Sequence, residues 1–172
     1  MDFLGLTHLT SAILAMIAGA FVIFTKKGTK NHVRLGYTYA AMMMILNATA
    51  FLIYDLFGHF GPFHWAALIS LATLIAGLLP AFLQRPRHSW LELHYEFMNW
   101  SIVGLYAAFW SETFTRFFRF EGFWILVSTA TFMTVAVGVY FIRKKKKQIL
   151  SRFDDIYAEG GQDTLSTEGS VS

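Results

Sequence analysis

The chain has 172 residues, of which 55% are hydrophobic, 17% aromatic and 15% charged, and its formal net charge is +3. It contains no cysteine, which excludes disulfide bonds, cysteine-ligated iron–sulfur clusters and haem attached through a C-x-x-C-H motif. The apolar residues form runs that are too long for a small soluble core and leave no room for a soluble domain.

Five apolar runs predict membrane-spanning helices. The first, residues 3–25, carries no charge, and at about 1.5 Å per residue it is long enough to cross about 30 Å of hydrocarbon. Asp2 precedes this run and lysines follow it, the reverse of a cleaved signal peptide, so we expect it to be retained. The predicted helices cover residues 3–25, 30–56, 63–84, 90–114 and 121–143.

The predicted fold is an all-α integral membrane protein with a four-helix core and a peripheral fifth helix. Residues 1–148 form the bundle, and the polar residues 149–172 form a cytoplasmic tail that we expect to be disordered. The core consists of two repeated hairpins, because Ile17-Ala18-Gly19 in the first is matched by Ile75-Ala76-Gly77 in the second. Parallel repeats of this kind imply a pseudo-two-fold axis along the membrane normal.

Lysine and arginine are distributed unequally between the two sides of the predicted bundle. Arg116 and Arg119 lie on one side, and all the others lie on the opposite side. The positive-inside rule then places the N-terminus outside and the C-terminus in the cytoplasm, which favours the cytoplasmic membrane as the location. The net charge reflects this topology and contact with anionic lipid, and it requires no nucleic-acid partner.

Four histidines alternate between the ends of the predicted helices. His8 and His64 lie at outer ends, and His32 and His94 lie at inner ends. Ionisable groups at bilayer depth are costly and usually functional. Because the pseudo-two-fold axis brings equivalent helices opposite each other, we expect His8 to face His64 and His32 to face His94. Two such pairs can hold two metal centres across a bilayer.

The residues around these histidines favour a ligand within the bundle. Gly36 follows His32 by one turn and leaves room for a porphyrin plane beside the imidazole, although ordinary helix packing also uses small residues. His94 and Glu112 are separated by 18 residues, about five helical turns. Both side chains are therefore expected to point into the bundle.

The sequence resembles two known groups. The first resemblance is carried by His8, Lys27-Gly28, His32, Gly36-Tyr37, His94 and Met98. With this pattern the chain resembles a bacterial multi-pass family, domain of unknown function 2306, over about residues 5–115. That family has no settled activity, so the resemblance implies a topology and little more. The architecture also resembles two-haem cytochrome b proteins, including the ascorbate-type transmembrane electron carriers.

The cytochrome resemblance implies an outer haem on His8 and His64 and an inner haem on His32 and His94. The chain departs from that group because it has no recognisable ascorbate- or quinone-binding motif, and because three of these histidines lie close to helix ends. The expected function is a b-type haem protein for electron transfer or haem handling. A quinone or a respiratory protein would be its partner, and a homo-oligomer is compatible with this function.

Bis-histidine haem also needs basic residues near the interface to pair with the propionates. The candidates are Arg34, Lys30 and Arg87 on the inner side and Arg116 or Arg119 on the outer side. The sequence does not decide whether the protein is an enzyme.

Two alternatives to haem stay open. The first is a non-haem zinc or copper site formed by His8, His64 and Glu112, because zinc prefers three or four nitrogen or oxygen ligands. The second is a structural or accessory membrane subunit without a cofactor, in which the histidines are merely interfacial.

Overall fold

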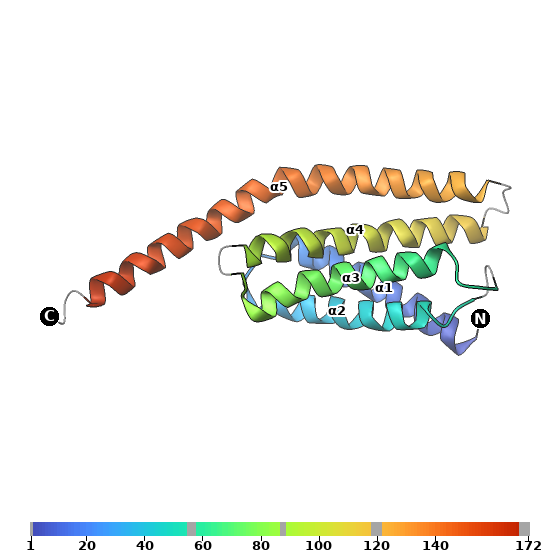
Figure 1. The fold of residues 1–172 in the computed structure, drawn as a ribbon, viewed down its shortest axis with the longest axis horizontal. Coiled ribbons are helices and arrows are strands. Elements are labelled where there is room, and N and C mark those ends of the chain that lie inside the picture. Colours follow the sequence, from blue (N-terminus) through green and yellow to red (C-terminus); the bar gives the residue numbers. More distant parts are fainter. Residues whose placement is uncertain (1, 55–57, 87–88, 118–121, 169–172) are drawn as a thin grey trace. The chain divides into compact units, whose positions relative to one another are not determined.

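The computed structural model describes residues 2–54, 58–86, 89–117 and 122–168, with side chains described up to Ser151. Within these ranges the regular secondary structure is α-helical and includes no strand. The helices (Figure 1) are α1 Phe3–Phe24, α2 Lys30–Ala50, α3 Pro62–Leu83, α4 Trp90–Phe117 and α5 Phe123–Glu168. The predicted helices are therefore present, with α2 ending earlier and α4 and α5 ending later than expected.

Local side-chain caps explain the starts of α1 and α2. The carboxylate of Asp2 accepts a hydrogen bond from the Gly5 N–H at 2.9 Å, and the hydroxyl of Thr29 accepts one from the His32 N–H at 3.3 Å. Such caps satisfy backbone donors that the first helical turn leaves free. Gly28 between the two helices has a φ of 77°, a left-handed conformation that favours glycine. The short turn makes α1 and α2 antiparallel neighbours.

The second hairpin has matching signals at its helix ends. Pro62 occupies the first turn of α3, where its missing N–H costs nothing. Gln84 follows the helix with a φ of 48°, the left-handed conformation that commonly terminates a helix. Pro80 lies inside the last part of α3 and cannot donate to the carbonyl of Ala76.

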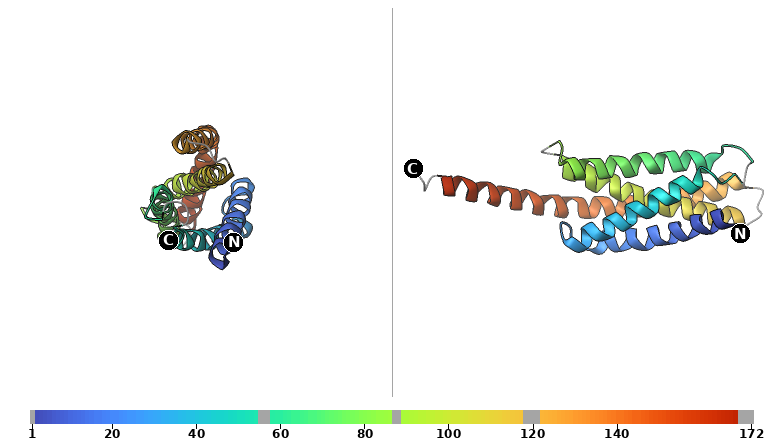
Figure 2. Two further views of the ribbon diagram at one scale, coloured as in Figure 1. Left: turned by 90° about the vertical axis from the view of Figure 1, so that its right-hand side faces the viewer. Right: turned by 90° about the horizontal axis from the view of Figure 1, so that it is seen from below.

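Helices α1 to α4 form a four-helix bundle. Helix α1 packs on α2 and α4, and α3 packs on the same two helices, so α1 and α3 lie on one diagonal and α2 and α4 on the other. Figure 2 shows this arrangement along the helix axes. Because equivalent helices of the two hairpins occupy the same diagonal, the arrangement agrees with the expected pseudo-two-fold symmetry.

The core shows why each hairpin carries the Ile-Ala-Gly triplet. A Cβ atom on Gly19 would lie 3.2 Å from the ring of Tyr39, and one on Gly77 would lie 2.8 Å from the sulfur of Met98. Each glycine thus makes room for a large side chain from the next helix. Tyr39 is fully buried and its hydroxyl lies 2.8 Å from the hydroxyl of Ser101, so one hydrogen bond crosses the α2–α4 diagonal.

Helix α5 begins against α4. The hydroxyl of Ser111 on α4 lies 3.3 Å from the hydroxyl of Thr131 on α5. Farther along, a Cβ atom on Gly138 would lie 2.5 Å from a methyl group of Val103, so this glycine permits close packing. Residues up to Gly138 belong to the same compact unit as the bundle.

The rest of the chain, Val139–Ser172, forms a second compact unit. The sequence predicts disorder from residue 149, whereas α5 is helical as far as Glu168. The physical reason for this difference is that extending an existing helix costs far less than starting one, and residues 149–159 include several good helix formers.

Three helices, α1, α3 and α5, are long and apolar enough to cross a membrane. Large apolar side chains such as Phe21, Ile69 and Phe132 are exposed on their surfaces. A soluble protein rarely exposes so much apolar surface, whereas a lipid-facing surface requires it. The chain is therefore an all-helical membrane protein.

Candidate functional sites at the two ends of the bundle

The two ends of the bundle are named by their turns. The inner end carries the α1–α2 turn at Gly28 and the α3–α4 turn after Gln84, and the outer end is the opposite one. His32 is the third residue of α2, and His94 is the fifth residue of α4. Both histidines therefore lie at the inner end, and His8 and His64 lie at the outer end, as the sequence predicts.

The two inner histidines lie together. The ring centroids of His32 and His94 are 6.4 Å apart, and the ring planes are perpendicular at 90°. The rings come from α2 and α4, which face each other across a diagonal of the bundle. The structure thus brings together one of the two pairs that the alternation suggested.

The hydrogen bond of His94 determines which ring nitrogen is free. Nδ1 of His94 lies 2.8 Å from the carbonyl oxygen of Gly77. Because a carbonyl only accepts, Nδ1 is the donor, and the neutral ring keeps a lone pair on Nε2. A histidine that binds a metal has this arrangement, with its second nitrogen donating to a carbonyl or carboxylate.

His32 has a ring nitrogen without a partner. Its Nδ1 is buried and has no hydrogen-bond partner among the described residues. A buried ring nitrogen left without a partner is uncommon, which makes His32 a candidate ligand.

The surroundings of the inner pair are open and basic. A Cβ atom on Gly36 would meet no heavy atom within 4 Å in the described part of the chain. Lys30 and Arg34 are exposed at this end. Arg87 and, at the other end, Arg119 lie outside the described residues.

At the outer end, His8 is held by Thr49 of α2. Nδ1 of His8 lies 3.0 Å from the Thr49 hydroxyl, which itself donates to the carbonyls of Ile45 and Leu46, each at 2.9 Å. The hydroxyl has a single proton, so its oxygen accepts from Nδ1 of His8. The neutral His8 ring therefore keeps a lone pair on Nε2.

That lone pair faces a carboxylate. Nε2 of His8 lies 3.7 Å from Oε2 of Glu112, and Oε1 of Glu112 accepts hydrogen bonds from Nη2 and Nε of Arg116 at 2.7 and 3.0 Å. Thr49, His8, Glu112 and Arg116 together form what we call the outer polar chain. Two lone-pair atoms face each other within it, so only a cation between them, a proton or a metal ion, makes the contact favourable.

His64 has different partners. Its Nδ1 accepts a hydrogen bond from the Gly61 N–H at 3.1 Å, so the neutral ring carries its proton on Nε2, which is buried with no partner among the described residues. The ring lies between those of Tyr54 and Phe60, with centroids 4.6 and 4.8 Å away. In this geometry His64 caps α3 and offers no lone pair to a metal. The pairing of His8 with His64 stays a prediction.

The described residues contain no group of three or more His, Asp or Glu side chains placed to hold one metal ion. The three-ligand site expected from His8, His64 and Glu112 is therefore not assembled in this geometry, although His8 and Glu112 do meet.

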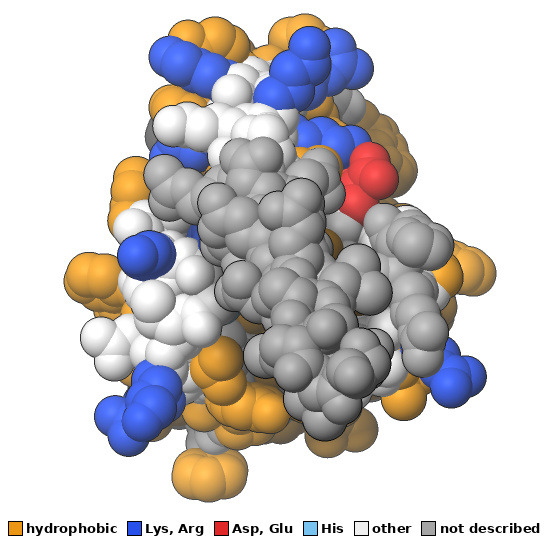
Figure 3. Space-filling model, turned by 90° about the vertical axis from the view of Figure 1, so that its left-hand side faces the viewer, with side chains coloured by type: hydrophobic (Ala, Val, Ile, Leu, Met, Phe, Trp, Pro, Cys, Tyr) orange, Lys and Arg blue, Asp and Glu red, His pale blue; other side chains and the backbone are white. Residues whose placement is uncertain are grey.

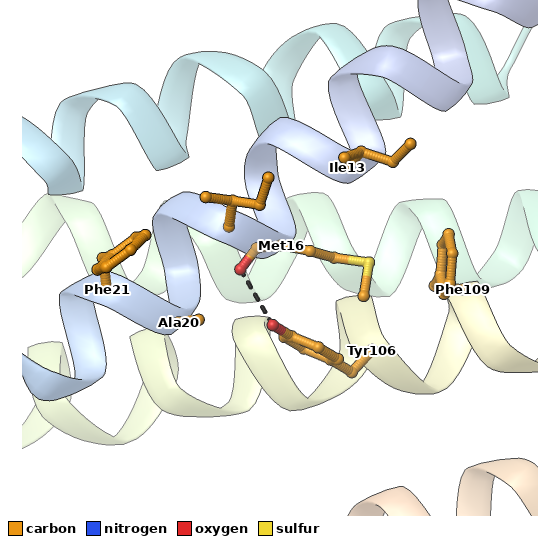
Figure 4. A pocket seen from close by; sticks show the side chains of 7 residues that line it. Ile13, Met16, Ala20, Phe21, Tyr106 and Phe109 are labelled. Carbon is orange, nitrogen blue, oxygen red and sulfur yellow. Dashed lines mark hydrogen bonds between the residues drawn. The ribbon is translucent and has the colours of Figure 1, made fainter.

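An apolar groove of about 390 Å³ lies between α1 and α4 (Figure 4). The hydroxyl of Tyr106 donates to the backbone carbonyl of Met16 at 3.0 Å, which satisfies that hydroxyl within the groove. The lining residues are Ile13, Met16, Ile17, Ala20, Phe21, Tyr106 and Phe109. Since no histidine or acid lines it, the groove is separate from both polar ends.

Two partners of the histidines were not predicted from the sequence: Thr49, which contacts His8, and the Gly77 carbonyl, which contacts His94. Thr49 lies 21 residues after Gly28 and His8 lies 20 residues before it. Residues equidistant from the turn of an antiparallel hairpin become neighbours, so this spacing was a usable signal for Thr49. The contact with Gly77 depends on a backbone carbonyl, for which the residue type gives no signal.

Comparison with known proteins places the chain in a family without assigning it an activity. No curated protein and no solved structure matches the chain. One family model, described as a predicted membrane protein (DUF2306), matches residues 5–145. The match covers α1 to α4 and the apolar part of α5, which is more of the chain than the resemblance alone suggested. The chain therefore belongs to the DUF2306 family of predicted membrane proteins.

Proposed function

We propose that the chain is a membrane haem protein that holds one b-type haem at the inner end, with His32 and His94 as the axial ligands. Its role would be electron transfer or haem handling, with a quinone or a respiratory protein as the redox partner. The observation that carries this proposal is the pair of imidazoles on opposed helices, one fixed by the Gly77 carbonyl and the other with a buried Nδ1 that has no partner among the described residues.

The spacing of the two rings supports one metal between them. Bonds from imidazole nitrogen to a metal are about 2.0–2.1 Å long, so two rings on opposite sides of one ion have centroids roughly 6 Å apart. The centroids of His32 and His94 are 6.4 Å apart. When bound, the haem iron supplies one-electron chemistry. The Gly77 carbonyl would hold the His94 ring in its orientation.

The residues beside the pair suit a flat, negatively charged cofactor. Gly36 offers open space one turn from His32. Lys30 and Arg34 are exposed at the same end and are available to pair with propionates. The core begins beyond this region with Tyr39 and Met98, so the cofactor would lie between the packed core and the membrane surface.

We include five membrane spans in the proposal, although α2 and α4 are less apolar than the other three helices. Their 21 and 28 residues give lengths of about 30 Å or more. Two polar residues near the middle of these helices lie inside the bundle, since Asn47 is 3% and Ser101 is 1% exposed. Polar groups that face the bundle interior are compatible with a span.

The proposed orientation places the inner end in the cytoplasm. Figure 3 looks onto this end, and side chains of Lys and Arg are spread over its described surface. The positive-inside rule associates such a surface with the cytoplasmic side.

The experiment is an absorption spectrum of the detergent-purified protein, oxidised and dithionite-reduced, with metal analysis of the same sample. A sharp reduced α-band with about one iron per chain supports a single low-spin haem. Colourless protein from haem-replete cells would overturn the proposal. Colourless, metal-free protein would instead favour a structural or accessory subunit.

A second candidate, a zinc or copper site, is favoured by the His8–Glu112 contact. The 3.7 Å between Nε2 and Oε2 is longer than a hydrogen bond, yet both atoms present lone pairs. Two bonds of about 2 Å to one ion would fit this gap, with water completing the coordination. Stoichiometric zinc or copper that is lost in Glu112→Gln would support this site, and retention in that variant would exclude it.

A further inference from the structure

Helix α5 changes character abruptly near its middle. Residues 123–142 carry no charge, and five consecutive cations follow immediately. We call this run, Arg143-Lys144-Lys145-Lys146-Lys147, the basic collar. The change from apolar to basic occurs inside a helix that continues without a break to Glu168.

Chain length places the collar at one depth. Twenty helical residues measure about 30 Å, which equals the thickness of the hydrocarbon core. If the uncharged stretch spans that core, Arg143 is the first residue beyond it. The collar itself is about 7.5 Å long, and each headgroup layer is about 5–7.5 Å thick. The whole collar therefore fits within one headgroup layer.

The collar surrounds the helix. Successive helical residues are turned by about 100°, so five consecutive residues cover the full circumference. Arg143, Lys144 and Lys147 are exposed. The Nζ atom of Lys144 also lies 3.3 Å from the hydroxyl of Tyr140 and 5.4 Å from the centre of its ring. Tyrosine is enriched at the membrane interface, which agrees with this depth.

We propose that the basic collar is a binding site for the headgroups of anionic phospholipids in the leaflet where α5 leaves the membrane. A cationic segment beside a membrane span is attracted to anionic lipid by about 1 kcal/mol for each Lys or Arg near the surface. The depth of the collar, within the headgroup layer, favours lipid headgroups over a protein or nucleic acid as its partner. The proposal does not depend on haem.

The test measures the phospholipids that remain bound to the full chain after mild detergent purification, by mass spectrometry. We expect the natural sequence to retain phosphatidylglycerol in preference to phosphatidylethanolamine. The triple variant Arg143→Gln, Lys144→Gln, Lys147→Gln should lower this preference by about fivefold or more. Lys145 and Lys146 are kept so that the orientation signal is not removed.

Two controls make the result decisive. The charge-preserving variant Arg143→Lys, Lys144→Arg, Lys147→Arg should retain the preference, because the attraction is electrostatic. The double variant Lys26→Gln, Arg85→Gln removes two exposed cations at the turns of the inner end and should keep most of it. An unchanged lipid preference in the collar variant would overturn the proposal, as would an equal loss in both glutamine variants.

Correct insertion is checked independently. The natural chain has no cysteine, so Ser172→Cys provides a single labelling site in each variant. Labelling of that site from the same side in the natural and collar-variant backgrounds shows that orientation is unchanged, so that a loss of anionic lipid reports on the collar.

Discussion

The inner and outer ends of the bundle each contain two predicted histidine ligands but differ in what these histidines can bind. At the inner end, the rings of His32 and His94 lie together; Nδ1 of His94 donates to the Gly77 carbonyl, and Nδ1 of His32 is buried with no partner among the described residues. At the outer end, His8 contacts Thr49 and Glu112, whereas His64 accepts from the Gly61 N–H and packs beside the rings of Tyr54 and Phe60.

The difference teaches that depth alone does not make a histidine a ligand. The partner of the second ring nitrogen determines whether a lone pair is available. When one ring nitrogen donates to a carbonyl, or to a hydroxyl whose proton is already donated elsewhere, the other ring nitrogen keeps a free lone pair. This is the case for His94 and His8. A backbone N–H takes the lone pair, as for His64.

The largest expected effect tests the contrast between the two ends directly. His94→Ala should abolish the reduced α-band and reduce bound iron to background, because one axial ligand and its Gly77 anchor are lost. His64→Ala should leave both unchanged. Spectra and iron content of the two purified variants provide the measurement. Equal loss of haem in both variants would contradict the contrast and point to an outer haem.

A second test concerns Gly77, the glycine of α3 against which Met98 of α4 packs. Gly77→Ala should lower the free energy of unfolding by about 1–3 kcal/mol, because the new Cβ atom would lie 2.8 Å from the Met98 sulfur and 3.0 Å from its backbone nitrogen. Gly104→Ala is the matched control, since its Cβ would meet nothing within 4 Å among the described residues. Thermal unfolding in detergent, followed by circular dichroism, should separate the two.

A third test addresses the layer between the two ends. Tyr39→Phe should destabilise the protein by about 1–3 kcal/mol, because it leaves the Ser101 hydroxyl buried without its partner. Adding Ser101→Ala should recover part of this loss, since neither group then remains unsatisfied. The same unfolding measurement on both single variants and the double variant gives the coupling energy. Strictly additive effects would show that the hydrogen bond contributes little.

The smallest effect is expected at the outer polar chain. Glu112→Gln removes the ion pair with the exposed Arg116 and should cost less than about 1 kcal/mol. Added salt should reduce the difference, because surface ion pairs are screened. Iron content should stay unchanged if the haem lies at the inner end. A large loss of stability together with loss of zinc would favour the outer metal site instead.

Much of the fold could be predicted from the sequence, because hydrophobic runs and turn residues are local signals. The predicted helix starts at residues 30 and 63 lie within one residue of the observed starts, Lys30 and Pro62. The repeated hairpin followed from the two Ile-Ala-Gly triplets. The helical continuation of α5 beyond residue 149 was not predicted, because polar composition is a weak guide next to an existing helix.

The candidate site was less predictable. The alternation of the four histidines correctly suggested that His32 and His94 face each other, since helix order fixes that diagonal. It could not distinguish His64 from the others, because the hydrogen bond from Gly61 depends on the rotamer of one side chain. The mutual contact of His8 and Glu112 also required the position of α1 against α4, which no local pattern encodes.

The diagonal placement of His32 and His94 has a consequence for how the protein is made. The two rings belong to different hairpins, so no site exists until α4 has joined α2 in the membrane. A chain that stops synthesis after α3 would insert without any capacity to load a cofactor. Loading of the proposed cofactor would therefore be a late step in biogenesis, possible only once α2 and α4 lie together.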